Sequence, residues 1–340
     1  MVQQRMSRVR GIAALAAIGL ALTACGGQAP ATSTGGSASG SATSPQVGIF
    51  VDNAFGDGDF FDQAAQAEGP LQSQFGAKVR TYEGQLNSQN FEPMLQDAAG
   101  ANKLVFVLGF EAIDALTKVA KDNPETTFVF IDGTVDGGQV VSAVFRTQEG
   151  CFMAGALAAT ANKAKASEVA GFIGGVNAPV VKKCESGFTQ GVEKVDGTQQ
   201  VAAQYVGSFV DPAKGREVAI ALQGKGAYAV FPYAGLSGAG AFDAAKSGVN
   251  VAPIGIVTDK GALAPGKSPG SLEMRVDQVI VQLTEAFTKG ELEQGSRHEY
   301  GFKEGGWKMV YNSDLLPRAQ VSSLEQLQNQ LVSGELKVRE

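Results

Sequence analysis

The sequence is poor in the side chains that most often perform catalysis or bind metals. Its 340 residues include one histidine, His298, in a connection rich in Gly and Glu near the end of the chain. A solitary histidine in such a setting is typical of a surface residue and not of a general base. No Cys/His group has the spacing of a metal site, and neither a Gly-x-Ser-x-Gly elbow nor a Walker loop occurs. We therefore expect no catalysis, no metal and no other cofactor.

Positive charge is also scarce. Charged residues make up 18% of the chain and leave a formal net charge of -6, whereas hydrophobic residues make up 44%. Proteins that bind nucleic acids present a basic face to the phosphates, so we expect no nucleic-acid partner. The apolar content is that of an ordinary globular protein with a sizeable core.

Residues 1–24 have the pattern of a secretion signal. Three arginines within the first ten residues precede an apolar stretch over 11–22 that is too short to span a bilayer stably. The stretch ends in Leu-Thr-Ala-Cys25, which resembles a bacterial lipobox, and the alternative is an ordinary signal peptide with a chance cysteine. The resemblance implies cleavage before Cys25, acylation of its sulfur and anchoring on the extracytoplasmic face of a bacterial cell membrane. The membrane contact would then be the lipid alone.

Residues 25–44 are almost entirely Gly, Ser, Thr, Ala and Gln, which predicts a flexible linker behind the lipidated cysteine. The folded part is expected over 45–340. The two remaining cysteines, Cys151 and Cys184, are an even pair in an oxidising compartment, which favours a disulfide over two buried thiols.

Strand and helix signals alternate through the folded part. Short apolar runs predict strands at 47–51, 78–82, 104–108, 127–131, 140–145, 169–173, 201–206, 227–231 and 251–257. Helical spacing predicts helices at 60–75, 90–100, 111–122, 149–163, 178–194, 213–222, 238–247, 276–289 and 324–331. Fully apolar strands between helices indicate an α/β fold with parallel sheets covered on both faces. Residues 299–311 alternate enough to predict a terminal hairpin around Gly305 and Gly306.

The βα series starts twice, which predicts two lobes joined by a hinge. We expect the first lobe to span about 45–149 plus part of 276–340, and the second to span about 150–275. The cleft between them is the expected ligand site. In open parallel sheets, ligands bind beyond the carboxyl ends of the strands, so Asp52 and Phe61, which follow the first strand, should face a ligand.

Two further motifs could be mistaken for ion sites. The acidic turn from Asp52 to Asp62 lacks an EF-hand pattern, because Ala54 and Gly56 occupy positions that need oxygen donors. Gly235 to Gly240 has the glycine density of a phosphate cradle, but close backbone approach or turn geometry explains it equally well.

A series of short segments, in this order, resembles the basic membrane lipoprotein family, the nucleoside-binding lipoproteins of ABC importers. The segments are Val47–Asp52, Phe61–Gln63, Phe106–Phe110, Phe128–Asp132, Gln148–Gly155, Gly171–Gly175, Gly187–Gly191, Tyr205–Asp211 and Ala234–Gly240. The resemblance implies a type I periplasmic-binding-protein fold, two doubly wound parallel-sheet lobes joined by a hinge. It also implies a small-molecule ligand, an ABC permease as partner and a monomeric receptor.

The resemblance assigns roles to individual residues. In relatives, the aspartate that ends the first strand holds the base and a phenylalanine nine residues later stacks on it; these positions are Asp52 and Phe61. Phe209 best matches the aromatic residue of the second lobe, with Tyr205 as a second choice. Core packing is the alternative role for both phenylalanines. The further ligand-binding positions are Asp62, Gly109, Phe110 and Gly235.

Two family ligand positions are replaced in this chain. Val257 stands where relatives carry an aspartate for the ribose hydroxyls, and Met274 stands where they carry a lysine. A buried hydroxyl without partners costs around 1 to 3 kcal/mol, so the usual ribose pose is disfavoured. A shift of the Thr258-Asp259-Lys260 loop could supply substitutes.

The leading interpretation is a lipid-anchored extracytoplasmic solute-binding protein of an ABC importer, specific for a nucleoside, a nucleobase or a similar small flat polar ligand. The alternative is a sensor or surface-interaction lipoprotein with an altered or vestigial cleft. A hydrolase is least favoured, because Asp52, Asp57, Asp59 and Asp62 could cluster but no second motif supplies an acid partner.

Overall fold

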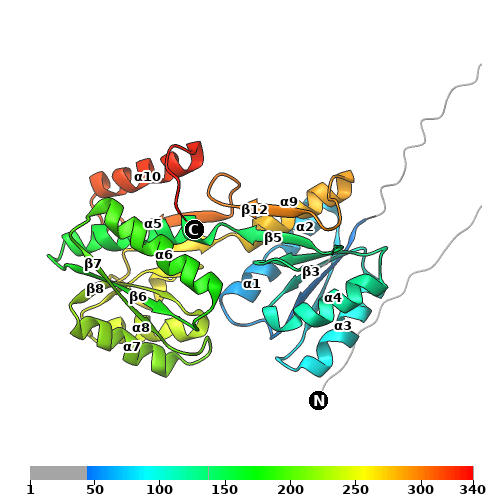
Figure 1. Cartoon of the computed structure of the whole chain (residues 1–340), viewed down its shortest axis with the longest axis horizontal. Helices are drawn as coiled ribbons and strands as arrows, with labels where there is room; N and C mark the ends of the chain where they lie inside the picture. The colour runs from blue at the N-terminus through cyan, green and yellow to red at the C-terminus, as the bar shows by residue number, and fades with distance from the viewer. Residues whose placement is uncertain (1–43, 137, 340) are drawn as a thin grey trace, which may run out of the picture. The chain divides into compact units, whose positions relative to one another are not determined.

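Six parallel strands form the first sheet of the computed structural model, which describes residues 44–136 and 138–339 (Figure 1). The sheet order is β12-β5-β4-β3-β1-β2. The strands are β1 (Gln46–Val51), β2 (Lys78–Glu83), β3 (Leu104–Leu108), β4 (Thr127–Ile131), β5 (Val141–Phe145) and β12 (Arg297–Tyr300). The predicted signal peptide, Cys25 and most of the linker lie outside the described residues.

Alternate residues of these strands pack against helices on opposite faces. Ile49 and Phe106 belong to a core with Leu71 and Ile280, whereas Phe50 belongs to a core on the other face with Leu116. The helices are α1 (Phe60–Ala65), α2 (Glu68–Phe75) and α9 (Val276–Lys289) on the first face, and α3 (Ser88–Ala101) and α4 (Ile113–Asp122) on the second, with the short 3-10 turn η1 (Phe110–Ala112) before α4. Both faces are therefore covered, as the apolar strands predicted.

The single helix predicted over 60–75 is wrong, because the structure divides it into α1 and α2. Pro70 has no N–H to donate to the carbonyl of Gln66, and its ring would clash there. The helix therefore ends at Ala65 and starts again at Glu68.

A second parallel sheet has the order β7-β6-β8-β9 and its own two helix layers. Its strands are β6 (Val169–Gly174), β7 (Gln200–Tyr205), β8 (Ala227–Tyr233) and β9 (Ala252–Pro253). Helices α5 (Thr147–Lys163) and α6 (Pro179–Val195) cover one face, while α7 (Pro212–Gly224) and α8 (Ala239–Lys246) cover the other, with the turn η2 (Gly235–Gly238) before α8. The lobe limits given above stay a prediction.

The predicted hairpin over 299–311 is wrong. Its first part, β12, pairs parallel with β5 in the six-stranded sheet. Its second part, β13 (Trp307–Tyr311), pairs antiparallel with β11 (Gly270–Met274), which also pairs with β10 (Gly255–Val257). The strand predicted at 251–257 likewise divides between two sheets at Ile254. Each half finds a distant partner, which local alternation cannot predict.

The three chain segments that connect the lobes, at Arg146, at Arg275 and at 300–307, are joined by hydrogen bonds. The N–H of Arg146 donates to the carbonyl of Tyr300 (2.9 Å), that of Arg275 donates to Gly306 (2.8 Å), and the indole of Trp307 donates to the carbonyl of Arg146 (3.2 Å). The guanidinium of Arg146 also pairs with Glu149 (2.7 Å) and with Glu304. The chain therefore crosses between the lobes through one hydrogen-bonded region, as a hinge requires.

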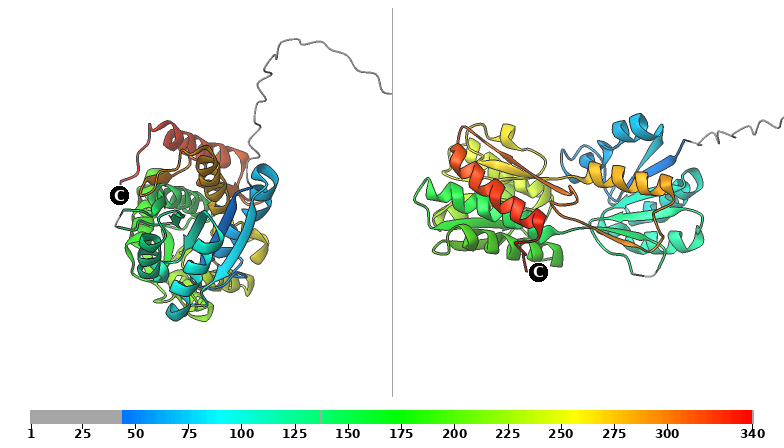
Figure 2. Two further views of the ribbon diagram at one scale, coloured as in Figure 1. Left: turned by 90° about the vertical axis from the view of Figure 1, so that its right-hand side faces the viewer. Right: turned by 90° about the horizontal axis from the view of Figure 1, so that it is seen from above.

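Figure 2, in the view from above, shows α9 on the first lobe and α10 (Arg318–Ser333) over the second. The final helix was predicted over 324–331, and the structure extends it at both ends. It lies against α5, so the end of the chain adds a further layer to the second lobe.

Helices α5 and α6 pack backbone to backbone. A Cβ at Gly155 would lie 2.0 Å from the carbonyl oxygen of Phe188, and one at Gly191 would lie 1.9 Å from that of Phe152. A disulfide between Cys151 and Cys184 joins the same two helices. Only glycine permits this separation of the two helices.

Gly191→Ala should lower the free energy of unfolding by about 1 to 3 kcal/mol or more. The added methyl would meet the carbonyl oxygen of Phe152, which is held in α5 and cannot move freely. Gly100→Ala is the matched control: this glycine lies in α3 with nothing near its Cβ position, so the change should stabilise by up to about 1 kcal/mol. Denaturant titration measures both. An unchanged Gly191→Ala midpoint would contradict the described packing.

Candidate functional site

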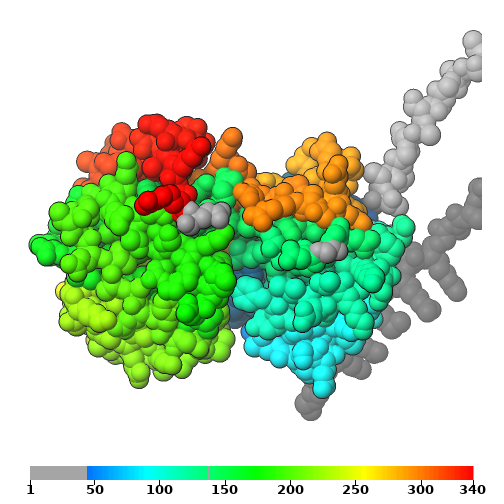
Figure 3. Space-filling model, viewed as in Figure 1, coloured from blue at the N-terminus to red at the C-terminus, as the bar shows by residue number. Residues whose placement is uncertain are grey.

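A cavity of about 370 Å³ lies between the two lobes. Figure 3 shows the surface hollowed there, with atoms of the N-terminal segment, in blue, inside the hollow. From the first lobe the lining residues are Asp52, Asn53, Asp57, Asp59, Phe60, Phe61, Leu86, Gly109, Phe110, Glu111, Ile131 and Asp132. From the second side they are Val180, Phe209, Val210, Tyr233, Ala234, Gly235, Leu236, Ile256, Val257 and Met274.

The residues predicted for the ligand site mostly meet at this cavity. Its lining includes Asp52, Phe61, Gly109, Phe110, Phe209 and Gly235, together with the replaced positions Val257 and Met274. Two predicted residues do not line it. Asp62 accepts hydrogen bonds from the N–H groups of Gly56 (2.7 Å) and Gly58 (2.8 Å), and the hydroxyl of Tyr205 bonds to Glu185.

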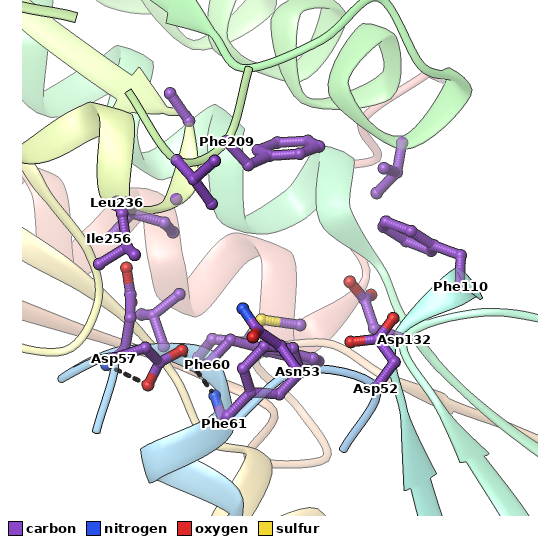
Figure 4. A pocket seen from close by; sticks show the side chains of 18 of the residues that line it. Asp52, Asn53, Asp57, Phe60, Phe61, Phe110, Asp132, Phe209, Leu236 and Ile256 are labelled. Carbon is purple, nitrogen blue, oxygen red and sulfur yellow. Dashed lines mark hydrogen bonds between the residues drawn. The ribbon is translucent and has the colours of Figure 1, made fainter. Parts of the chain in front are cut away.

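Aromatic rings approach the cavity from opposite sides. Phe60 and Phe61 lie edge to face, with centroids 5.6 Å apart, and Figure 4 shows Phe209 across the cavity from them. The Phe209 ring rests on Gly175, where a Cβ would lie 2.3 Å from two ring carbons. The position of the ring thus depends on the absence of a side chain at residue 175.

The acidic turn before α1 positions Phe61. The carboxylate of Asp57 accepts from the N–H groups of Asp59 (2.9 Å), Phe61 (3.1 Å) and Asp62 (3.1 Å). Backbone donors at a helix start otherwise lack partners, so the Asp57 carboxylate serves the backbone here. Among the residues that the structure describes, no group of three or more His, Cys, Asp or Glu side chains could hold a metal ion.

Asp52 is buried and shares a hydrogen bond with a second acid. Its side chain is 2% exposed, and Oδ2 accepts from the N–H of Glu111 at 3.3 Å. Burial raises the pKa of Asp52 to about 8, and a hydrogen bond between the Asp52 and Glu111 carboxyls adds to this rise. That carboxyl–carboxyl bond also holds the pKa of Glu111 below its usual range. Gly109 lies directly against the carboxylate, where a Cβ would be 1.8 Å from Asp52 Cγ. No larger residue fits there without displacing Asp52.

Asp132 is an acid of the cavity that we did not predict. It follows β4 with φ at 68°, a conformation that aspartate tolerates better than most residues. Burial raises the pKa of Asp132 to about 7. Near neutral pH, Asp52 and Asp132 can therefore each donate or accept a hydrogen bond. The sequence signal that could have identified Asp132 is its position directly after the predicted strand at 127–131. In the structure this strand, β4, lies beside β3.

An ion pair joins the two sides at one end of the cavity. Nζ of Lys260, after β10, lies 3.1 Å from Oδ2 of Asp59, before α1. Burial raises the pKa of Asp59 to about 6, although the Lys260 charge opposes the rise. The side chain of Lys260 therefore points to Asp59. Asp259, in the same loop, accepts a hydrogen bond from the hydroxyl of Ser271 at 3.0 Å. Neither Lys260 nor Asp259 lines the cavity, so in this structure they do not replace the ribose-binding groups of the relatives.

Tyr233 and Phe60 were also missed. Burial raises the pKa of Tyr233 well above its usual value, and the charges of Asp132 and Asp59 add to the effect. Tyr233 ends β8 and could have been chosen by the same strand-end rule as Asp52. Phe60 precedes Phe61 directly, and no sequence signal shows that both face the ligand side.

Asp132→Asn should raise the melting temperature of the ligand-free protein, by an amount that grows as pH rises from 5 to 8.5. An aspartate whose folded pKa is raised binds more protons folded than unfolded, so its burial costs stability as pH rises through that range. We expect a difference of roughly 2 to 4 °C at the upper end. Asp97→Asn, on the exposed face of α3, is the control. Parallel wild-type and Asp132→Asn curves would contradict the burial of Asp132.

Within residues 44–136 and 138–339, none of the helices combines the length and the apolar composition of a membrane span. The structure of an ABC transporter solute-binding protein from Aeropyrum pernix superposes with a TM-score of 0.74 at 24% identity, over 86% of this chain and 92% of that chain. This similarity and the parallel sheets confirm the predicted two-lobed fold.

The sequence comparisons identify the family. Basic membrane protein A of Borreliella afzelii is 28% identical over 300 residues, which cover 86% of this chain and 91% of the relative. The ABC transporter nucleoside-binding protein BmpA of Lactococcus lactis is 34% identical over 221 residues, or 60% and 62% of the two chains. A family model described as ABC transporter substrate-binding protein PnrA-like matches residues 44–340. The chain therefore belongs to the PnrA-like family of ABC transporter substrate-binding proteins.

Proposed function

We propose that this protein is the lipid-anchored, extracytoplasmic receptor of an ABC importer for a nucleoside, a nucleobase or a similar small flat polar ligand. The arrangement of rings carries the proposal: Phe60 and Phe61 lie on one side of the cavity and Phe209 on the other. A heterocycle between them would gain roughly 1 to 3 kcal/mol from stacking on each ring.

The acids supply the second requirement for a nucleobase. Asp52 and Asp132 both line the cavity, and Figure 4 shows them on the same side of it. A base edge presents alternating N–H donors and ring-nitrogen or carbonyl acceptors. Two acids with raised pKa values suit such an edge, because each can take either role near neutral pH.

The lobes supply the mechanism of transport. A ligand that touches both sides of the cavity favours the state in which they are close, and the ABC permease would recognise that state. The Lys260 and Asp59 pair, which also joins the two sides, adds to the closed arrangement. Acyl chains on Cys25 would hold this monomer beside the permease, with residues 25–44 as its linker.

The relatives and the cavity favour this role over the alternative of a sensor or surface-interaction lipoprotein. A vestigial cleft has no need to keep about 370 Å³ of space with phenylalanines on two sides. No catalytic role is proposed, because the family is one of solute-binding proteins.

Titration calorimetry of the full chain in detergent, against purines, pyrimidines and their nucleosides, should find at least one binder. Phe209→Ala should weaken its binding by about 5- to 150-fold, since one stacking ring is lost. Tyr228→Ala is the control, because Tyr228 lies outside the cavity lining, in contact with Lys165. Binding of none of these compounds, with simple sugars bound instead, would contradict the proposed ligand class.

Cys25→Ala should release the protein from the membrane fraction of the cells that express it, because acylation needs the thiol. A Cys151→Ser and Cys184→Ser double variant, which keeps Cys25, is the control and should remain with the membrane. Membrane fractionation followed by immunoblotting measures the distribution. A Cys25→Ala protein that still sediments with the membrane would contradict lipid anchoring at this residue.

A further inference from the structure

The two ends of the cavity differ in character. One end carries the carboxyls of Asp52, Glu111 and Asp132. The other is lined by Leu236 and Ile256, with Val257 next to Ile256 in β10 and Met274 at the end of the adjacent strand β11. Figure 4 shows Asp52 and Asp132 on one side of Phe209, with Leu236 and Ile256 on the opposite side. Among the described residues that line the cavity, none is Lys, Arg or His.

The apolar end includes a residue in an unfavourable backbone conformation. Val257 has φ at 70°, in the left-handed region, where a β-branched side chain is an outlier. Aspartate and asparagine tolerate this region better. The chain thus keeps an apolar surface at a position where its backbone would accept a polar residue more readily.

The two carboxylates near the apolar end are already largely engaged. Asp57 accepts three backbone N–H groups, and Oδ2 of Asp59 pairs with Lys260. Oδ1 of Asp59 has no hydrogen-bond partner, but it is closed off from solvent. A ligand hydroxyl could reach this atom only if the ion pair moved.

The Asp57 carboxylate has about four acceptor sites and already accepts three bonds, so it can serve at most one of two sugar hydroxyls at this end. At least one hydroxyl of the pair would therefore lose its water without gaining a partner. Each unpaired hydroxyl would weaken binding by about 5- to 150-fold. An apolar or deoxygenated substituent would instead gain from contact with Val257 and Met274.

We infer that the cavity selects a planar, N–H-bearing heterocycle without vicinal hydroxyls, such as a free nucleobase or a base with a deoxygenated or alkyl substituent. The inference rests on the proposed function and narrows it: the acids bind the ring edge, Phe209 and Phe61 cover the ring, and the apolar end excludes an intact ribose.

Titration calorimetry on the full chain tests the inference with matched sets: hypoxanthine, inosine and 2′,3′-dideoxyinosine, and the equivalent adenine and uracil sets. In the set that binds, the base and the dideoxynucleoside should bind at least about 10-fold more tightly than the ribonucleoside. A ribonucleoside that binds as tightly as its dideoxy form would overturn the inference and leave the proposed function standing. Failure of every compound would overturn both.

Val257→Asp provides the converse test, because it places an acceptor at the apolar end and suits the left-handed backbone. The ribonucleoside should gain at least about 10-fold relative to the dideoxynucleoside. Val332→Asp adds the same charge on the exposed side of α10 and should leave this ratio unchanged. A Val257→Asp protein with an unchanged ratio would overturn the inference. If that variant fails to fold, the wild-type comparison alone still supports or overturns it.

Discussion

The direction of the parallel strands is the constraint on which this molecule depends. Most residues that line the cavity lie at or beyond the carboxyl end of a strand: Asp52 after β1, Gly109 after β3, Asp132 after β4, Phe209 after β7 and Val257 at the end of β10. Because parallel strands end at a common edge, residues far apart in the sequence meet there without specific long-range signals. The hinge around Arg146 then brings the two edges to face one another.

This constraint explains why so much was accessible from the sequence. The apolar runs at 104–108 and 127–131 are buried at every residue, so their strands could be predicted almost to the residue. Asp52 and Phe61 follow from the first strand by the same rule, and the family resemblance added Phe209. All three line one cavity.

The failures came from interactions that no local pattern encodes. Strand β12 pairs with β5, about 155 residues earlier in the chain, and Lys260 reaches Asp59 across the cleft. The family resemblance over Phe61–Gln63 implies a ligand-binding role for Asp62, but its carboxylate accepts hydrogen bonds from the backbone of Gly56 and Gly58. A shared motif therefore does not fix where a side chain points when its residue type differs from that of the family.

The same electrostatic pattern links stability and binding. Asp52, Asp59 and Asp132 are buried acids with raised pKa values, so the ligand-free protein is destabilised by their ionisation. A ligand that donates N–H groups to Asp52 and Asp132 would offset part of that cost, and this would couple occupancy to the closed form. Functional sites often keep such strained or desolvated groups, because their cost is recovered on binding.

A crystal structure of the protein with a bound nucleobase would test the central claim most directly. The account predicts electron density for a flat ring between Phe209 and Phe61, with ring N–H groups within hydrogen-bond distance of Asp52 or Asp132. A ring bound outside this cavity, or one that leaves Phe209 and Asp52 without contact, would contradict it.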